Sequence, residues 1–204
     1  MILLLALLAQ DALKKGDAWA FERTYRYVNE AEGIDMGDVE RTDVSVADVR
    51  PDGYDLAISR KLIVTKLGEN RSPAPADQTP WTKTLKFGAN GQPNGLPEDV
   101  QRPIRARIDR MLWTASENRR GLGWNRTWPL NETLPEGKAT VKPSGEGRLS
   151  ITYTEAGGLK AEGTATRDRK RPVIVEMSAT INRTYLPGGN VPVAVAVKQL
   201  PAVG

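Results

Sequence analysis

Alternation of hydrophobic and polar positions runs through most of the chain and predicts β-strands. In the first such segment, residues 18–28, aromatic side chains fall at alternate positions and therefore share one face: Trp19, Phe21, Tyr25 and Tyr27. The same pattern predicts further strands over residues 42–49, 54–64, 81–87, 124–130, 148–154, 159–166, 173–184 and 191–198. We expect a mainly β (α+β) fold, an antiparallel sheet of about eight to ten strands. So many strands do not stay flat, and the sheet is expected to curl into a half-barrel or to close.

One segment near the middle of the chain has helical spacing instead. Its apolar residues recur every three or four positions between about 98 and 114: Val100, Ile104, Ile108, Met111 and Leu112. Proline is tolerated in the first turn of a helix, so Pro103 places the start of the regular helix near residue 102. We expect one long helix whose apolar face docks on the sheet.

Residues 69–80 contain Pro73, Pro75 and Pro80 among small polar residues, and they predict an internal loop or linker. Residues 30–40 are polar, contain Gly33 and Gly37, and predict another loop. Nothing else suggests a boundary, so residues 13–204 are interpreted as a single β-rich domain.

The apolar run of residues 2–8 is too short to cross a membrane but resembles the hydrophobic part of an export signal. Residues 1–12 are therefore predicted to be a signal peptide, with the mature chain starting between Gln10 and Leu13. The absence of a basic residue before the run and a poor cleavage pattern leave an alternative, a first strand or helix of the fold. We expect an exported protein, periplasmic or extracellular.

The chain has no Cys and no His, which excludes the usual zinc and iron–sulfur sites, thiol nucleophiles and imidazole-dependent triads. We expect no cofactor, no metal site and no catalytic activity. Asp35, Asp38 and Glu40 could provide oxygen ligands for calcium, but they lack the alternating pattern of a calcium loop and are interpreted as an acidic turn.

The net charge of +4 hides an asymmetry, because residues 1–55 carry −6 and the remainder +10. This favours either a basic surface for an anionic partner or acidic strands paired with basic ones across the sheet, and we favour the second. Arg105, Arg107 and Arg110 accompany tryptophans, as in some nucleic-acid-binding segments. Asp109 interrupts the run, so we expect a solvated helix face and no nucleic-acid partner.

Two functions follow from this layout. In the first, the curved sheet and the helix enclose an apolar cavity for a lipid or other hydrophobic ligand, with the helix as plug or lid. Its expected lining is Trp19, Phe21, Tyr25, Tyr27, Ile104 and Ile108. The order of elements is loosely similar in architecture to bacterial periplasmic lipoprotein carriers with an open barrel. In the second, the protein is a structural or adhesive envelope component, whose strand at 191–198 pairs with a protein partner at an exposed edge marked by Pro192.

Overall fold

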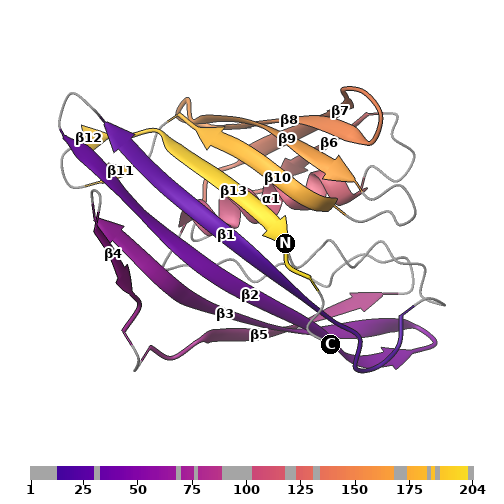
Figure 1. Cartoon of the computed structure of the whole chain (residues 1–204). Coiled ribbons are helices and arrows are strands. Elements are labelled where there is room, and N and C mark those ends of the chain that lie inside the picture. The colour runs from indigo at the N-terminus through magenta and orange to yellow at the C-terminus, as the bar shows by residue number, and fades with distance from the viewer. Residues whose placement is uncertain are drawn as a thin grey trace.

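The computed structural model describes residues 13–29, 33–67, 70–75, 78–88, 103–117, 123–130, 134–167, 174–182, 185–186 and 189–201. The predicted signal peptide, residues 1–12, lies outside these residues. Within them the fold is mainly β, with one helix (Figure 1).

The first part of the described chain contains β1 (Ala18–Asn29), β2 (Ile34–Arg50), β3 (Gly53–Leu67), β4 (Asn70–Pro73) and β5 (Trp81–Gly88), followed by helix α1 (Pro103–Glu117). The second part contains β6 (Trp124–Trp128), β7 (Gly137–Pro143), β8 (Arg148–Glu155), β9 (Lys160–Arg167), β10 (Ile174–Ile181), β11 (Tyr185–Leu186), β12 (Gly189–Asn190) and β13 (Val193–Gln199). β11 and β12 form a small separate hairpin.

The remaining 11 strands form one antiparallel sheet in the order β4-β3-β2-β1-β13-β10-β9-β8-β7-β6, with β5 also paired to β3. The first and last strands of the sheet in sequence, β1 and β13, are neighbours in its middle. Helix α1 lies in the connection from β5 to β6, which are edge strands at opposite ends of the sheet. The predicted antiparallel β-rich fold is therefore confirmed, and the sheet is open.

Two predictions of local structure are wrong, and one strand was missed. Residues 34–40, expected in a loop, are the start of the 17-residue strand β2. Gly37 is needed in this strand because a side chain there would collide with the carbonyl oxygen of Tyr25 in β1. Asn70–Pro73, expected in a loop, is β4 and pairs with the end of β3, and β7 was not predicted. Short polar or glycine-containing strands have weak alternation, so pairing partners decide their structure.

β13 is also not an edge strand, because it pairs with β1 on one side and β10 on the other. The expectation that residues 191–198 offer a free edge is therefore wrong. Pro192 precedes the strand and needs no ladder hydrogen bond. The alternation of the segment arises because Val193, Val195 and Val197 face the core.

Helix α1 has 15 residues and starts at Pro103, close to the predicted position; residues 98–102 lie outside the described part. Ile104, Ile108 and Leu112 are buried in the core, which confirms that this face docks on the sheet. The helix packs mainly on β6, β7, β8 and β10. Among the described residues, no helix is long and apolar enough to cross a membrane.

Candidate functional site: a buried charge cluster beneath the helix

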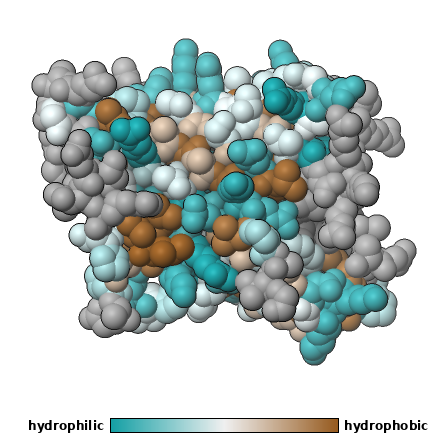
Figure 2. Space-filling model, viewed as in Figure 1, coloured by the Kyte–Doolittle hydropathy of each residue, from teal (hydrophilic) through white to brown (hydrophobic). Residues whose placement is uncertain are grey.

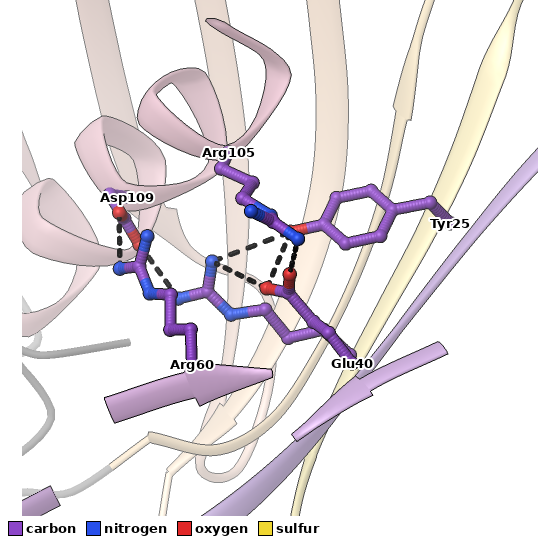
Figure 3. A network of polar contacts seen from close by, with 6 residues as sticks. Tyr25, Glu40, Arg60, Arg105 and Asp109 are labelled. Carbon is purple, nitrogen blue, oxygen red and sulfur yellow. Dashed lines mark hydrogen bonds and ion pairs between the residues drawn. The ribbon is translucent and has the colours of Figure 1, made fainter. Parts of the chain in front are cut away.

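The inner face of the sheet, which faces the core, carries charged side chains in its first half. Arg23 in β1, Glu40 in β2 and Arg60 in β3 point toward α1, where they meet Arg105 and Asp109 (Figure 3). All five residues are buried, and none is more than 7% exposed. We call these five residues, with Tyr25, the Asp109 cluster.

Asp109 is the centre of the cluster. Its Oδ1 accepts a hydrogen bond from Nη2 of Arg23 at 2.7 Å, and its Oδ2 accepts one from Nη2 of Arg60 at 2.7 Å. Burial by itself raises the pKa of Asp109, but the two guanidinium groups outweigh that effect and hold it well below the usual value. The carboxylate is therefore charged at all physiological pH values.

Glu40 is the second carboxylate. It forms an ion pair with Arg105 and accepts a hydrogen bond at Oε1 from the Tyr25 hydroxyl at 3.2 Å. Nη1 of Arg23 donates to the Tyr25 hydroxyl at 3.4 Å and lies 3.8 Å from Oε1 of Glu40. Burial, and then the charge of Glu40, raise the pKa of Tyr25, so the phenol stays protonated and can donate.

The Asp109 cluster contains three guanidinium groups and two carboxylates. Several buried donors around Arg60 have no hydrogen-bond partner in the described part of the chain: its Nε and Nη1, Nε of Arg23 and Oγ1 of Thr42. Thr42 is paired with Arg60 across β2 and β3, so the two side chains are neighbours on the inner face. Buried polar groups are normally hydrogen-bonded, and this concentration of exceptions marks the place as a candidate site.

Trp81 covers one side of Arg60. The centre of its ring is 4.7 Å from the guanidinium carbon, a cation–π distance. Trp81 is the first residue of β5, pairs with Arg60 in the sheet and is only partly buried. The aromatic ring occupies a face of the guanidinium, whose N–H groups point outward in the plane of the group. The Arg60 end of the cluster therefore lies beside an edge strand.

A second polar cluster joins α1 to the other half of the sheet. Arg107 makes two hydrogen bonds of 2.8 Å to the carboxylate of Glu155 in β8, which also accepts one from the Tyr153 hydroxyl at 2.8 Å. Arg110 donates to the Tyr153 hydroxyl at 3.1 Å and to the carbonyl oxygens of Pro135 and Pro129. Unlike the Asp109 cluster, this Glu155 cluster has no buried polar side-chain atom without a partner.

The described residues also form an open groove of about 660 Å³ on the opposite, outer face of the sheet. Small side chains from four strands line it, among them Ala18, Ala20, Ser45, Ala57 and Thr84. The surface view in Figure 2 has hydrophobic patches among hydrophilic side chains. Within the described part of the chain, none of the buried side-chain polar atoms without a hydrogen-bond partner belongs to a residue lining this groove.

The residues predicted to line a ligand cavity are all near the inner face but do not all meet. Phe21, Tyr25, Ile104 and Ile108 are buried in the core, whereas Trp19 and Tyr27 are partly buried and pack against it. Trp19 also lines the outer groove. Of the predicted lining residues, only Tyr25 belongs to the Asp109 cluster. The five charged residues of that cluster were not predicted to form a site.

Two predictions about charged residues are wrong. Arg105 and Arg110 are buried and do not lie on a solvated helix face, because their guanidinium groups find acceptors in the sheet. Asp35, Asp38 and Glu40 lie in strand β2 and do not form an acidic turn. Asp35 pairs with Arg26, and Glu40 faces the core.

A signal for the cluster was present in the alternation. Arg23 lies between Phe21 and Tyr25 on the same face of β1, and Arg60 continues the face of Leu56 and Ile58 in β3. A charged residue in register with a buried face requires a partner.

No family model matches the chain, and no curated protein matches it.

Proposed function

We propose that the protein is an exported, non-catalytic envelope protein that binds a hydrophobic ligand, such as a lipid, between its curved half-barrel sheet and α1. The open sheet supports this proposal, since α1 lies in the connection between its two edges. In such an arrangement the helix can act as a lid over the inner face.

The observation that carries the proposal is the difference between the two sides of α1. Met111, Leu112 and Ala115 are fully buried in the apolar core, and α1 packs mainly on β6, β7, β8 and β10. Toward β1, β2 and β3 it presents Arg105 and Asp109, which form ion pairs. Separating a buried ion-paired interface restores the hydration of its charges, which offsets much of the lost attraction. The opposite side of α1 also has an ion pair, Arg107–Glu155, but it is held in addition by packing on β6, β7, β8 and β10. The side facing β1–β3 is therefore where α1 would move away from the sheet.

Apolar side chains that could contact a ligand lie on the inner face of the same half. Tyr54 and Phe87 are stacked with ring centres 4.8 Å apart, and Leu56 and Phe21 are fully buried. Because these side chains are buried in the structure, a ligand could reach them only if the packing on this side of the molecule opens. The apolar part of the ligand would then take the place of protein side chains that now cover this face.

The test uses an uncharged fluorescent probe, N-phenyl-1-naphthylamine, and protein freed of lipid by refolding. Wild-type protein is expected to bind the probe with a stoichiometry of one and to release it to a long-chain lipid. Asp109→Asn is expected to speed probe association, since it weakens the polar side of α1. The matched variant Glu155→Gln, at the opposite side, is expected to leave the rate unchanged.

Native mass spectrometry of protein purified from its source organism adds a direct measurement, because a carrier is expected to retain a ligand of defined mass. Absence of probe binding to folded, lipid-free protein would overturn the proposal. A structural or adhesive role would then be the better account, acting through a surface other than β13.

A further inference from the structure

We propose that the outer face of β7, β8 and β9 binds an acidic polysaccharide, that is, a chain of sugar units that carry carboxylates. These strands lie near the β6 end of the sheet, away from β4 and β5 (Figure 1). The proposal is independent of the hydrophobic ligand proposed above, because that ligand concerns the inner face of the sheet.

The outer face of these strands carries four exposed cationic side chains. None of the four makes an ion pair or a side-chain hydrogen bond in the described part of the chain. We call them the basic face: Lys138 and Lys142 in β7, Arg148 in β8 and Lys160 in β9. The outward positions of β7 and β8 include no carboxylate; Glu162 in β9 and Glu176 in β10 lie farther along the sheet.

The other half of the outer face differs, because its arginines are paired with carboxylates. Three ion pairs lie there, all between residues of the acidic first part of the chain: Arg26–Asp35, Arg41–Asp43 and Arg50–Asp55. The carboxylates of that part therefore neutralise its own arginines and leave the basic face with its positive charge. A surface of one charge sign favours a partner of the opposite sign.

The spacing of the cations favours a polymer over a small anion. Lys138 and Lys142 are four residues apart on one face of β7, which corresponds to about 13 Å. Arg148 lies diagonally across the hairpin from Lys142, about 7 to 8 Å away. Lys138 and Lys160 are opposite Thr154 on its two sides, so they are two strand spacings apart, about 10 Å. Cations separated in this way suit a chain whose charges repeat at intervals.

Two hollows of the protein surface border the basic face. One, of about 680 Å³, lies at β6 and β7 and is lined by Asn125, Thr140 and Lys142 among others. The second, of about 320 Å³, is lined by hydroxyl groups, one cation and one carboxylate: Ser144, Thr164, Thr166, Ser178, Arg148 and Glu176. Lys142 and Arg148 therefore border space that a ligand can enter.

The side chains between the cations favour a sugar chain. They are short and carry hydroxyl groups: Thr140, Ser150, Thr152 and Thr154. A hydroxyl both donates and accepts hydrogen bonds, as the hydroxyls of a sugar do. Single-stranded nucleic acids are bound by basic residues together with aromatic side chains on which the bases stack. The described outward positions of β7 and β8 include no aromatic side chain, so this face fits a carboxylated sugar chain better than a nucleic acid.

The experiment measures binding of polygalacturonate by isothermal titration calorimetry, with its fully methyl-esterified form as the uncharged counterpart. Wild-type protein is expected to bind polygalacturonate but not the ester, and its affinity is expected to fall as the NaCl concentration rises. Two other polyanions test the sugar: polyacrylate, and the single-stranded nucleic acid poly(dT). Both are expected to bind at least about fivefold more weakly, because they lack the hydroxyls of the sugar chain.

The double variant Lys138→Gln and Lys142→Gln is expected to weaken polygalacturonate binding about tenfold, through the loss of two exposed ion pairs. The matched control, Lys61→Gln with Lys86→Gln, removes two charges from β3 and β5 and is expected to leave the affinity unchanged. All four lysines are exposed, so both variants are expected to fold like the wild type, which circular dichroism checks. Thr152→Val is expected to weaken polygalacturonate binding severalfold and to leave polyacrylate binding unchanged.

Each contrary result overturns a stated part of the proposal. No binding of polygalacturonate to folded protein would overturn it entirely, and equal binding of the ester would overturn the role of charge. Equal affinity for polyacrylate or poly(dT) would overturn the sugar chain in favour of polyanions in general or a nucleic acid. Equal losses in the two double variants would overturn the assignment to the basic face. All of these results leave the hydrophobic-ligand proposal standing, because its probe assay reports on the inner face.

Discussion

The two polar clusters on α1 contain the same kinds of side chain but differ in how completely their buried polar atoms are hydrogen-bonded. In the Glu155 cluster each buried polar side-chain atom has a partner, partly because Arg110 reaches two backbone carbonyl oxygens. In the Asp109 cluster donors of Arg23 and Arg60 are left without partners in the described chain. A complete network stabilises one packing arrangement, whereas an incomplete one retains capacity for another group. The comparison therefore locates the candidate site on the β1–β3 side of the helix.

The largest effect is expected from Asp109→Ala. The substitution removes the shared acceptor and leaves the buried guanidinium groups of Arg23 and Arg60 without their carboxylate. Breaking a buried ion pair by removing one partner typically costs about 3 to 5 kcal/mol of unfolding free energy. Urea denaturation monitored by circular dichroism measures it. A loss below about 1 kcal/mol would contradict the central role of Asp109.

Ile108→Ala tests the apolar attachment of the same helix. Ile108 is fully buried, and its truncation leaves a cavity, so a loss of about 2 to 5 kcal/mol is expected in the same urea experiment. A loss below about half a kcal/mol would mean that the apolar face of α1 is not buried against the sheet.

The pH dependence of stability sharpens the comparison. Because the pKa of Asp109 is lower in the folded state, its contribution is fully present above its ordinary pKa and is lost as the pH falls through the folded value. The difference in unfolding free energy between wild type and Asp109→Asn is therefore expected to be constant from about pH 7 to 5 and to shrink below about pH 4. Urea denaturation across this range measures it. A difference that shrinks already between pH 7 and 5 would show that Asp109 is not held ionised.

The smallest effect is expected from Glu155→Gln, about 1 kcal/mol. The glutamine can still accept a hydrogen bond, the side chain of Arg107 is 17% exposed to water, and Arg110 keeps its carbonyl acceptors. The same denaturation experiment compares it with Asp109→Asn. An equal or larger loss for Glu155→Gln would remove the distinction between the two clusters.

Many of the strands and the helix could be predicted from the sequence, because local patterns of apolar and polar residues indicate them. Alternation identified β1, β3, β8 and β10, and the spacing of Ile104, Ile108 and Leu112 identified the buried side of α1. The start of β2, β4 and β7 could not be found this way. Their polar residues and glycines have weak local preferences, and they are strands because a neighbouring strand pairs with them.

By itself, the sequence determined which side chains share a face, since side chains alternate along a strand and repeat every three to four residues along a helix. It therefore determined that Arg23 accompanies Phe21 and Tyr25, and that Arg105 and Asp109 are one turn apart. Only the tertiary structure decided that these charges meet. Arg23, Arg60 and Asp109 are far apart in the chain and come together because β1, β2 and β3 pair in one register and α1, which packs on β6, β7, β8 and β10, presents Asp109 toward their inner face. Such pairing depends on contacts between distant segments, which no local pattern contains.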